Sequence, residues 1–216
     1  MKMSPGILAR GPWQPSQVHS RWLEEPYQPS PEASAAADEA IAALARRGSP
    51  AHDGLSARLV AFSADDLQLE LELQPLRWSL RLSPIDASQS LAAMCVVRSS
   101  DGRWLAGRRA EWLASWPGRW ALGAGGAVEP GEHPVDTLTR ELAEEWSVQP
   151  ERTTVEALVC LPQRMTILIG MGWLADGAAV VPDAEHDEYA WWPAEPARWP
   201  AEADGAVREM GKMLAP

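Results

Sequence analysis

Alternating apolar and polar residues predict strands in the first third of the chain. Residues 67–73 (LQLELEL) alternate strictly, and residues 57–62 and 76–82 follow the same period more loosely around Pro75. A period of two is that of a half-buried strand, so we expect antiparallel strands here. Further strands are expected from apolar runs at 91–97, 103–109, 154–161, 165–175 and 189–192.

Three segments have helical patterns. Residues 32–47 are Ala-rich, with acidic residues early, arginines late and Gly48 as a stop. Residues 134–147 place Val135, Leu138 and Leu142 on one face, which we expect to pack on a sheet. Residues 201–214 predict a last helix. The mixture of strands and helices along the chain predicts an α+β fold, with a sheet flanked by helices.

The chain divides into three parts by composition. Residues 1–33 are Pro-rich without periodicity, which predicts an extended arm that wraps a neighbour or stays disordered, and Trp13 and Trp22 favour wrapping. We expect an extension with a helix and antiparallel strands at 34–85, and the main domain at 86–216.

Composition and charge narrow the class of protein. The formal net charge of −11 repels phosphate backbones, so we expect no nucleic-acid polymer as partner. Cys95 and Cys160 lie in apolar runs without metal-ligand spacing, so we expect two buried thiols, with no disulfide framework or zinc site. No stretch has the length of a signal-peptide core or a membrane span. A cytoplasmic enzyme or binding protein is therefore expected.

The segment 126–148 carries the candidate chemistry. Glu141, Glu144 and Glu145 fall on one face of the predicted helix, after a Gly-rich turn and Glu132. A solvated acidic face is one interpretation; the other is a carboxylate site for Mg²⁺ or Mn²⁺, which would also accept phosphate oxygens. The turn lacks the pattern of either nucleotide-binding glycine loop, so we expect close backbone approach there, with the Gly126 carbonyl as a further ligand.

The same segment resembles the Nudix box, G-x5-E-x7-R-E-U-x-E-E-x-G-U with U aliphatic, at eight of its nine defined positions. The matching residues are Gly126, Glu132, Arg140, Glu141, Leu142, Glu144, Glu145 and Val148. The departure is Ser147 in place of Gly, at a helix end where Gly eases a left-handed turn. We expect a small structural cost and unchanged chemistry.

The resemblance implies a Nudix-type α/β/α sandwich and hydrolysis of a nucleoside diphosphate linked to another moiety, using Mg²⁺ or Mn²⁺. It implies metal ligation by Glu141, Glu144 and Glu145, with Glu132 supporting them or binding a further metal. Arg140 would hold the carboxylates in place. Glu141 or a loop carboxylate would orient or deprotonate the attacking water, and Glu188 is our choice in the acidic loop before 189–192. We expect His186, in the same loop, at the surface.

Other residues bear on the substrate. Arg108, Arg109 and Arg119 are candidate phosphate contacts, with a solvated or salt-bridged role as the alternative, and Trp192 is a candidate pocket residue. Pro162 lies close to the position of a proline found in ADP-ribose-type pyrophosphatases, so ADP-ribose or nucleotide sugars are favoured.

Three other hypotheses remain open. One is a non-catalytic Nudix-fold module that senses a nucleotide or contacts a partner. Another is an isopentenyl-diphosphate isomerase, whose fold is shared, but the active-site cysteine expected near the Gly-rich segment is absent. The third concerns assembly: the strands at 57–82 would form a homodimer surface.

Overall fold

The structure, a computed structural model, describes residues 3–49 and 53–215 and has a large mixed sheet at its centre. Its eight strands are β1 (Gly6–Trp13), β5 (Leu91–Arg98), β6 (Trp104–Arg109), β7 (Trp120–Leu122), β8 (Ala124–Ala127), β9 (Arg152–Cys160), β10 (Thr166–Trp173) and β11 (His186–Trp192). The main order is β1-β9-β10-β5-β6-β11, with β7 beside β6 and β8 beside β5. Strand β5 runs parallel to β10, and the other pairs are antiparallel.

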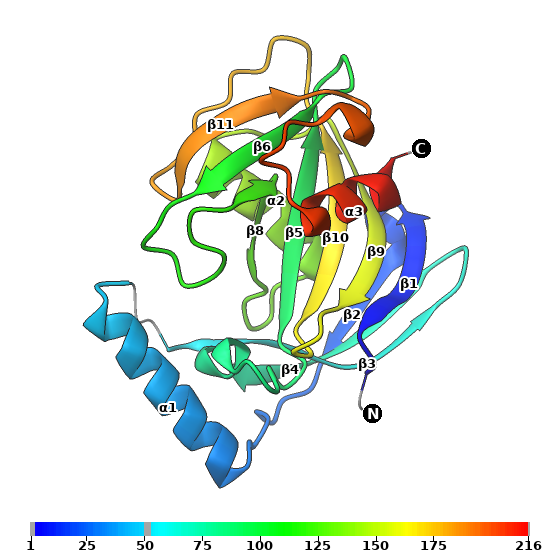
Figure 1. Ribbon diagram of the computed structural model, residues 1–216. Coiled ribbons are helices and arrows are strands. Elements are labelled where there is room, and N and C mark those ends of the chain that lie inside the picture. Colours follow the sequence, from blue (N-terminus) through cyan, green and yellow to red (C-terminus); the bar gives the residue numbers. More distant parts are fainter. Residues whose placement is uncertain (1–2, 50–52, 216) are drawn as a thin grey trace.

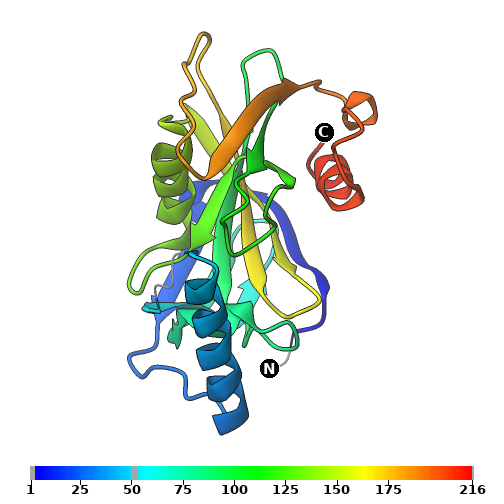
Figure 2. The same ribbon diagram turned by 60° about the vertical axis from the view of Figure 1, so that its left-hand side comes forward.

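Two helices cover opposite faces of this sheet (Figures 1 and 2). They are α2 (Pro134–Trp146) and α3 (Gly205–Leu214). Along β5, Cys95 and Val97 face the core under α2, whereas Val96 faces the core under α3. Burial on both faces explains why this strand is a continuous apolar run rather than an alternating one. The α+β sandwich expected from the sequence is confirmed.

A second sheet has the order β2-β4-β3 and packs against the α2 side of the core. Its strands are β2 (Val18–Trp22), β3 (Leu55–Ala64) and β4 (Leu69–Arg77). Leu69, Leu71 and Leu73 are buried, and the polar residues between them are not, which is the physical basis of the strict alternation. Strand β3 is antiparallel to β4, as expected, whereas β2 is parallel to it.

The strand expected at 76–82 is wrong over most of its length. Residues Trp78–Leu82 form a 3₁₀ helix, η2. The turn is held by Asp53, whose carboxylate accepts from the backbone N–H of Ser79 at 3.1 Å. Helix α1 (Pro31–Arg46) packs on this turn through Ala37, which meets Leu80 in a small core of its own. The helix matches the segment predicted at 32–47 within one residue.

The residues predicted to form an N-terminal arm are built into the fold. Strand β1 pairs with β9 at the edge of the large sheet, and Trp13 at its end is buried. A short 3₁₀ turn, η1 (Pro15–Gln17), then leads into β2. The segment therefore packs on this chain's own sheets and links the two. The three-part division of the chain stays a prediction.

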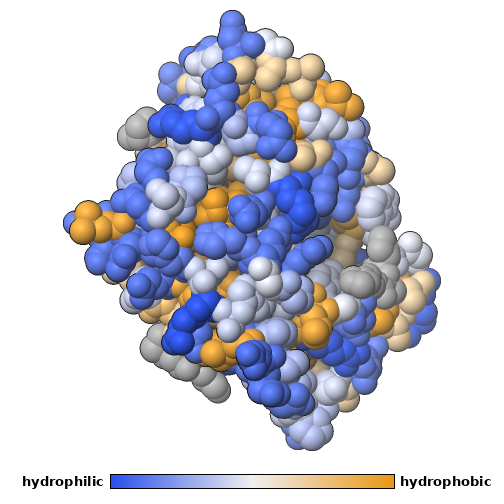
Figure 3. Space-filling view, turned by 180° about the vertical axis from the view of Figure 1, so that it is seen from behind, coloured by the Kyte–Doolittle hydropathy of each residue, from blue (hydrophilic) through white to orange (hydrophobic). Residues whose placement is uncertain are grey.

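The remaining expectations concern the C-terminal part and the surface. Helix α3 begins at Gly205, because Asp204 caps it by accepting from the N–H of Val207 at 3.0 Å, and the 3₁₀ turn η3 (Pro196–Arg198) precedes it. Cys95 and Cys160 are buried free thiols, as predicted. No helix in the described ranges is long and apolar enough to cross a membrane. Seen from behind, the surface is mostly hydrophilic, with small hydrophobic groups between (Figure 3).

Helix α2 ends on a residue in the left-handed conformation. Ser147 has φ 55° and ψ 35°, and its N–H bonds back to the Ala143 carbonyl at 3.2 Å. A β-carbon is unfavourable in this region, and glycine has none. The cost expected from serine at this position is thus explained by its backbone geometry.

We expect Ser147→Gly to raise the free energy of unfolding by about 0.5–1 kcal/mol, because it removes the strained β-carbon from an exposed helix end. Urea unfolding of the purified chain measures this change. Ser147→Ala is the control, since it keeps the β-carbon and should bring no gain. An equal gain from both variants would contradict the explanation.

Candidate functional site

The candidate site lies where α2 meets β8 and the loop between them. Strand β8 pairs with β5, and the chain then turns through Glu129–Glu132 into α2. The helix begins at Pro134, after His133, whose Nδ1 accepts from the N–H of Val135 at 3.3 Å. Trp146 at the other end is fully buried and donates from Nε1 to the Gly123 carbonyl at 3.0 Å. The helix is therefore fixed at both ends relative to the Gly-rich strand.

Two of the predicted glutamates are buried against that strand. Glu145 Oε1 accepts from the backbone N–H of Gly125 at 3.0 Å. The carboxylate of Glu141 lies on Gly126 so closely that a β-carbon at 126 would collide with it. A side chain at 126 would thus displace the Glu141 carboxylate from its present position, which gives a physical reason for glycine at this residue. Glu144, one turn from Glu141, remains exposed.

Arg140 is bonded to three carboxylates. Its guanidinium binds Glu132 through Nε at 2.8 Å and Nη2 at 3.1 Å, and Nη1 donates to Glu141 at 2.8 Å and to Glu144 at 3.1 Å. The Glu132 pair is bidentate, and such charge-assisted bonds are the stronger ones. These contacts raise the pKa of Arg140, and although burial opposes the effect, they hold the pKa of Glu132 below its ordinary value.

Burial governs the ionisation of the inner carboxylates. Desolvation raises the pKa of Glu145, and the nearby charge of Glu141 adds to the rise. The pKa of Glu141 is also raised by burial, against the attraction of Arg140. Glu145 Oε2 is buried and has no hydrogen-bond partner. Arg140 pairs with Glu141, whereas Glu145 Oε2 is a buried acceptor that a bound cation would satisfy.

The donor set fits a hard divalent cation. Carboxylate and carbonyl oxygens are the ligands that Mg²⁺ and Mn²⁺ prefer, and the unpartnered Oε2 of Glu145 is an available donor. In the described ranges, 3–49 and 53–215, no three acidic, His or Cys side chains already form a metal cage. Arg140 bonds to three of the carboxylates instead. A cation would thus be held after local side-chain adjustment.

Two arginines reach this site, and one of them was missed. Arg109 lies 3.8 Å from Glu185 and donates from Nε to the Ser115 carbonyl at 3.1 Å. Arg81, in η2, interacts with the charges of Glu141 and Arg109, and burial lowers its pKa. It makes no hydrogen bond or ion pair with any part of the chain that the structure describes. Sequence gave no signal for Arg81, because only the tertiary fold brings η2 to the box.

In the acidic loop before β11, Glu185 and not Glu188 interacts with the box. Glu188 is exposed and lies 3.4 Å from Arg108. Glu185, for which no role is predicted, interacts with the charge of Glu145, and burial raises the pKa of Glu185. The expectation that His186 lies at the surface is wrong, because its side chain is 1% exposed. Strand β11 begins at His186, three residues before the start expected from the sequence, and its pairing with β6 is shifted in register between His186 and Glu188.

Arg119 and Trp192 are not brought to the glutamates. Trp192 is buried on the α3 side and stacks with Trp120 and Trp199 at 5.5 and 5.2 Å. Arg119 pairs with Asp204 at the start of α3. It lines an apolar cavity of about 460 Å³ between α3 and the sheet, which includes Met94 and Ile169. Their assignment to the substrate site gains no support from position.

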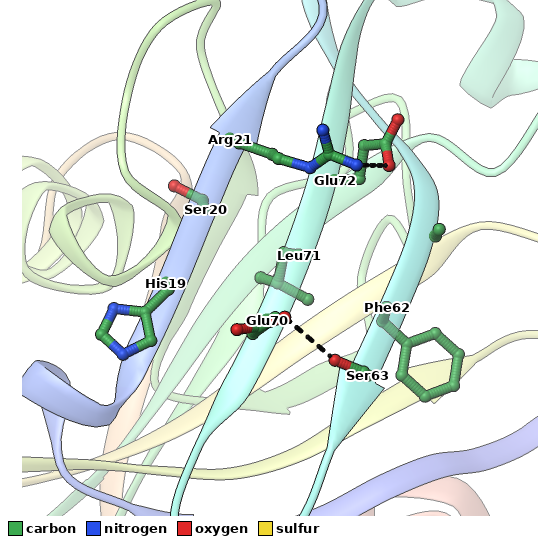
Figure 4. A pocket seen from close by; sticks show the side chains of 9 residues that line it. His19, Ser20, Arg21, Phe62, Ser63, Glu70, Leu71 and Glu72 are labelled. Atoms are coloured by element: carbon green, nitrogen blue, oxygen red, sulfur yellow. Dashed lines mark hydrogen bonds and ion pairs between the residues drawn. The ribbon is translucent and has the colours of Figure 1, made fainter.

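A second cavity, of about 360 Å³, lies on the small sheet (Figure 4). Arg21 pairs there with Glu72 at 2.6 Å, and Ser63 donates to Glu70 at 3.2 Å. Its polar groups thus largely satisfy one another. None of the box glutamates lines either cavity.

Comparison with known proteins agrees with this geometry. A family model described as "NUDIX domain" matches residues 89–214. Nucleoside triphosphatase NudI of Escherichia fergusonii is 44% identical over 52 residues, which are 24% of this chain and 36% of that protein. The NudI of an Escherichia coli strain is 41% identical over 56 residues, 26% of this chain and 39% of that one. The matched part thus spans little more than a third of these relatives.

Solved structures share the fold. One from Deinococcus radiodurans has a TM-score of 0.52 at 17% identity, covering 72% of this chain and 96% of that one. The NUDIX domain of Shewanella oneidensis NrtR, solved with ADP ribose, has a TM-score of 0.45 at 19% identity, covering 57% and 84%. Because the family model matches more than half of the chain and includes α2, α3 and every strand of the large sheet except β1, the chain belongs to the NUDIX domain family.

Proposed function

We propose that the chain is a divalent-metal-dependent pyrophosphohydrolase that cleaves the diphosphate linkage of a nucleoside diphosphate joined to another moiety. The observation that carries the proposal is the buried Glu141 and Glu145 pair, seated on Gly125 and Gly126 with one carboxylate oxygen unpartnered. Family membership supports the hydrolase class. ADP-ribose and nucleotide sugars are the favoured substrates, on the sequence resemblance at Pro162.

The cation in this proposal is Mg²⁺ or Mn²⁺. Glu141, Glu144 and Glu145 would hold it, with the Gly126 carbonyl and Glu132 as further ligands. When bound, it polarises phosphoryl oxygens and lowers the pKa of a bound water. Arg140 is not available for substrate, because its donors are committed to carboxylates and to the Ala127 carbonyl.

Recognition of the diphosphate then depends on cations that are not fully paired. Arg109 is held at one edge by a backbone carbonyl, and the carboxylate with which it forms an ion pair, Glu185, is 3.8 Å away. Arg81 has no anionic partner in hydrogen-bonding reach within the described chain. Guanidinium groups bind phosphate oxygens through paired N–H donors. Arg108 is a further candidate beside Glu188.

A carboxylate accepts the proton of the attacking water while the water oxygen bonds to phosphorus and the leaving phosphate departs. Glu141 is one candidate, and the loop carboxylates Glu188 and Glu185 are the others. The raised pKa of Glu185 suits a base that works near neutral pH. A sensing module has no need of such a base or of buried carboxylates, so hydrolysis is the better proposal.

Two finer expectations belong to this proposal. A cytoplasmic location is one. The other is a homodimer through the extension, supported by the position of β2 and β3 as the outer strands of the small sheet. Light scattering of the purified chain decides the second, and a monomer at micromolar concentration would contradict it.

The proposed metal site predicts a metal-dependent activity. The purified chain should release phosphomonoester products from ADP-ribose or a nucleotide sugar with Mg²⁺, and not with a chelator. Glu145→Gln should lower the rate at least about 100-fold, because it removes a buried anionic ligand. The assay couples product release to a phosphatase and phosphate detection.

Glu39→Gln is the matched control, since it changes an exposed glutamate of α1. It should keep the full rate. Full activity of a folded Glu145→Gln protein would rule the assignment out, and inactivity of the wild-type chain on a broad panel of diphosphates would favour a sensing module.

Burial of Glu145 predicts that the stability of the metal-free chain depends on pH. The raised pKa of Glu145 means that the folded, metal-free chain holds a proton which the unfolded chain releases near the ordinary carboxyl pKa. This effect lowers stability as pH rises above that value, by at most about 1.4 kcal/mol per pH unit. In chelator, Tm should fall from pH 5 to 8 more steeply for the wild type than for Glu145→Gln. Parallel curves would contradict the burial argument.

The proposed role of Arg81 predicts an effect on substrate binding. Arg81→Ala should raise KM for a diphosphate substrate about 10-fold or more while Mn²⁺ affinity stays unchanged, because a charge-assisted contact is lost. Arg46→Ala, an exposed arginine of α1, is the control. An unchanged KM in Arg81→Ala would remove this residue from the phosphate site.

A further inference from the structure

His186 occupies a position beside the carboxylates that no expectation had assigned. It is the first residue of β11 and pairs with Arg109 of β6. The loop before it is anchored on the end of α2: the N–H of Val181 donates to the Trp146 carbonyl at 3.0 Å, and that of Asp183 to the Glu145 carbonyl at 2.9 Å. The backbone around His186 is thus tied to the backbone of Glu145.

The imidazole lies between two carboxylates. Nε2 is 3.6 Å from Glu145 Oε2, and Nδ1 is 3.6 Å from Asp183 Oδ1. Both ring nitrogens and Glu145 Oε2 are buried and make no hydrogen bond. An unmatched buried polar atom is costly. Nε2 and Glu145 Oε2 face each other, and a shift of a few tenths of an ångström brings them into hydrogen-bonding distance.

Packing fixes the ring in this place. Its centroid is 4.2 Å from that of Trp146, at an interplanar angle of 37°. On the neighbouring strand β6, a β-carbon at Gly107 would collide with the imidazole and with the indole of Trp146. Gly107 does not have a left-handed backbone, so room for these two rings explains this glycine. The ring therefore has little freedom except to present its nitrogens to the carboxylates.

The two carboxylates differ in their need for a donor. The side chain of Asp183 is 37% exposed, so water can solvate it, whereas that of Glu145 is 5% exposed. Glu145 Oε1 already accepts from Gly125, and no donor in the described residues makes a hydrogen bond to Oε2. An N–H at Nε2 thus satisfies the group that water does not reach.

We propose that His186 is a positioning residue for Glu145: when Glu145 ionises to bind a metal ion, the His186 Nε2–H holds Oε2 while the Gly125 N–H holds Oε1, so that the ionised carboxylate is oriented toward the ion. The inference rests on the proposed function, in which Glu145 is a metal ligand. Hydrogen bonds to a ligating carboxylate fix its orientation, and loss of such partners typically weakens metal binding about 10–100-fold.

The test measures Mn²⁺ affinity of the full chain by electron paramagnetic resonance, without any substrate. His186→Phe keeps a ring on Trp146 but has no N–H, so its Kd for Mn²⁺ should rise about 10-fold or more. His186→Gln can place an amide donor near the Nε2 position and should retain most of the affinity. His186→Asn is too short to reach Glu145 and should behave like Phe.

Tyr189→Phe is the matched control. Tyr189 also packs on Trp146, at 6.0 Å between ring centroids, but in the described residues its hydroxyl makes no hydrogen bond to Glu145 or Asp183. It should bind Mn²⁺ like the wild type. Wild-type affinity in His186→Phe, or equal affinity in the Gln and Asn variants, overturns the positioning role. If His186→Phe does not fold, the Gln and Asn pair decides.

The same titration separates this inference from the proposed function. If the wild type does not bind Mn²⁺ saturably, or if Glu145→Gln binds it equally well, the metal site itself is wrong and the inference falls with it. If the wild type binds, Glu145→Gln does not, and the His186 variants all match the wild type, only the positioning role is overturned.

Discussion

The constraint on which the site depends is the burial of two carboxylates against a glycine backbone. The Glu141 carboxylate lies where a side chain at residue 126 would collide with it, and Glu145 accepts from the backbone N–H of Gly125. Burial raises the pKa of both carboxylates, and repulsion by the charge of Glu141 adds to the rise for Glu145. Arg140 offsets part of this repulsion from one side, and His186 faces the pair from the other. The rest of the fold keeps these groups in register.

The small sheet β2-β4-β3 takes part in that task, although it lies outside the family match. Three hydrogen bonds join it to the segment around Glu132: the N–H of Ala57 donates to the Val128 carbonyl at 2.8 Å, Trp22 Nε1 to the Glu132 carbonyl at 3.2 Å, and His133 Nε2 to the Val18 carbonyl at 3.1 Å. Strands β2 and β3 therefore support the loop from outside. Loosening either strand is expected to disturb Glu132 before it disturbs α2.

Local pattern was enough for the helices, for most strands of the main domain and for the box, but not for β1, β2, β8 and η2 or for the residues that surround the box. The apolar period predicts the helix at Pro134–Trp146, and the helix in turn places its glutamates on one side. Strand β8 was missed because AGGA has low strand propensity and forms only by pairing with β5. His186 and Arg81 were missed because their partners are distant in sequence, and a lone charged or aromatic residue in a loop has no period.

The distribution of positive charge then argues for a joint binding surface. The chain has a net charge of −11, and Arg140, the arginine of the box, is already paired with Glu132 and Glu141. An anionic substrate must therefore find its partners elsewhere, and Arg109 comes from the main domain while Arg81 comes from η2. Because η2 is held by Asp53 and by α1, the geometry of Arg81 depends on the extension. Substrate choice in this protein is accordingly expected to vary with the extension as well as with the box.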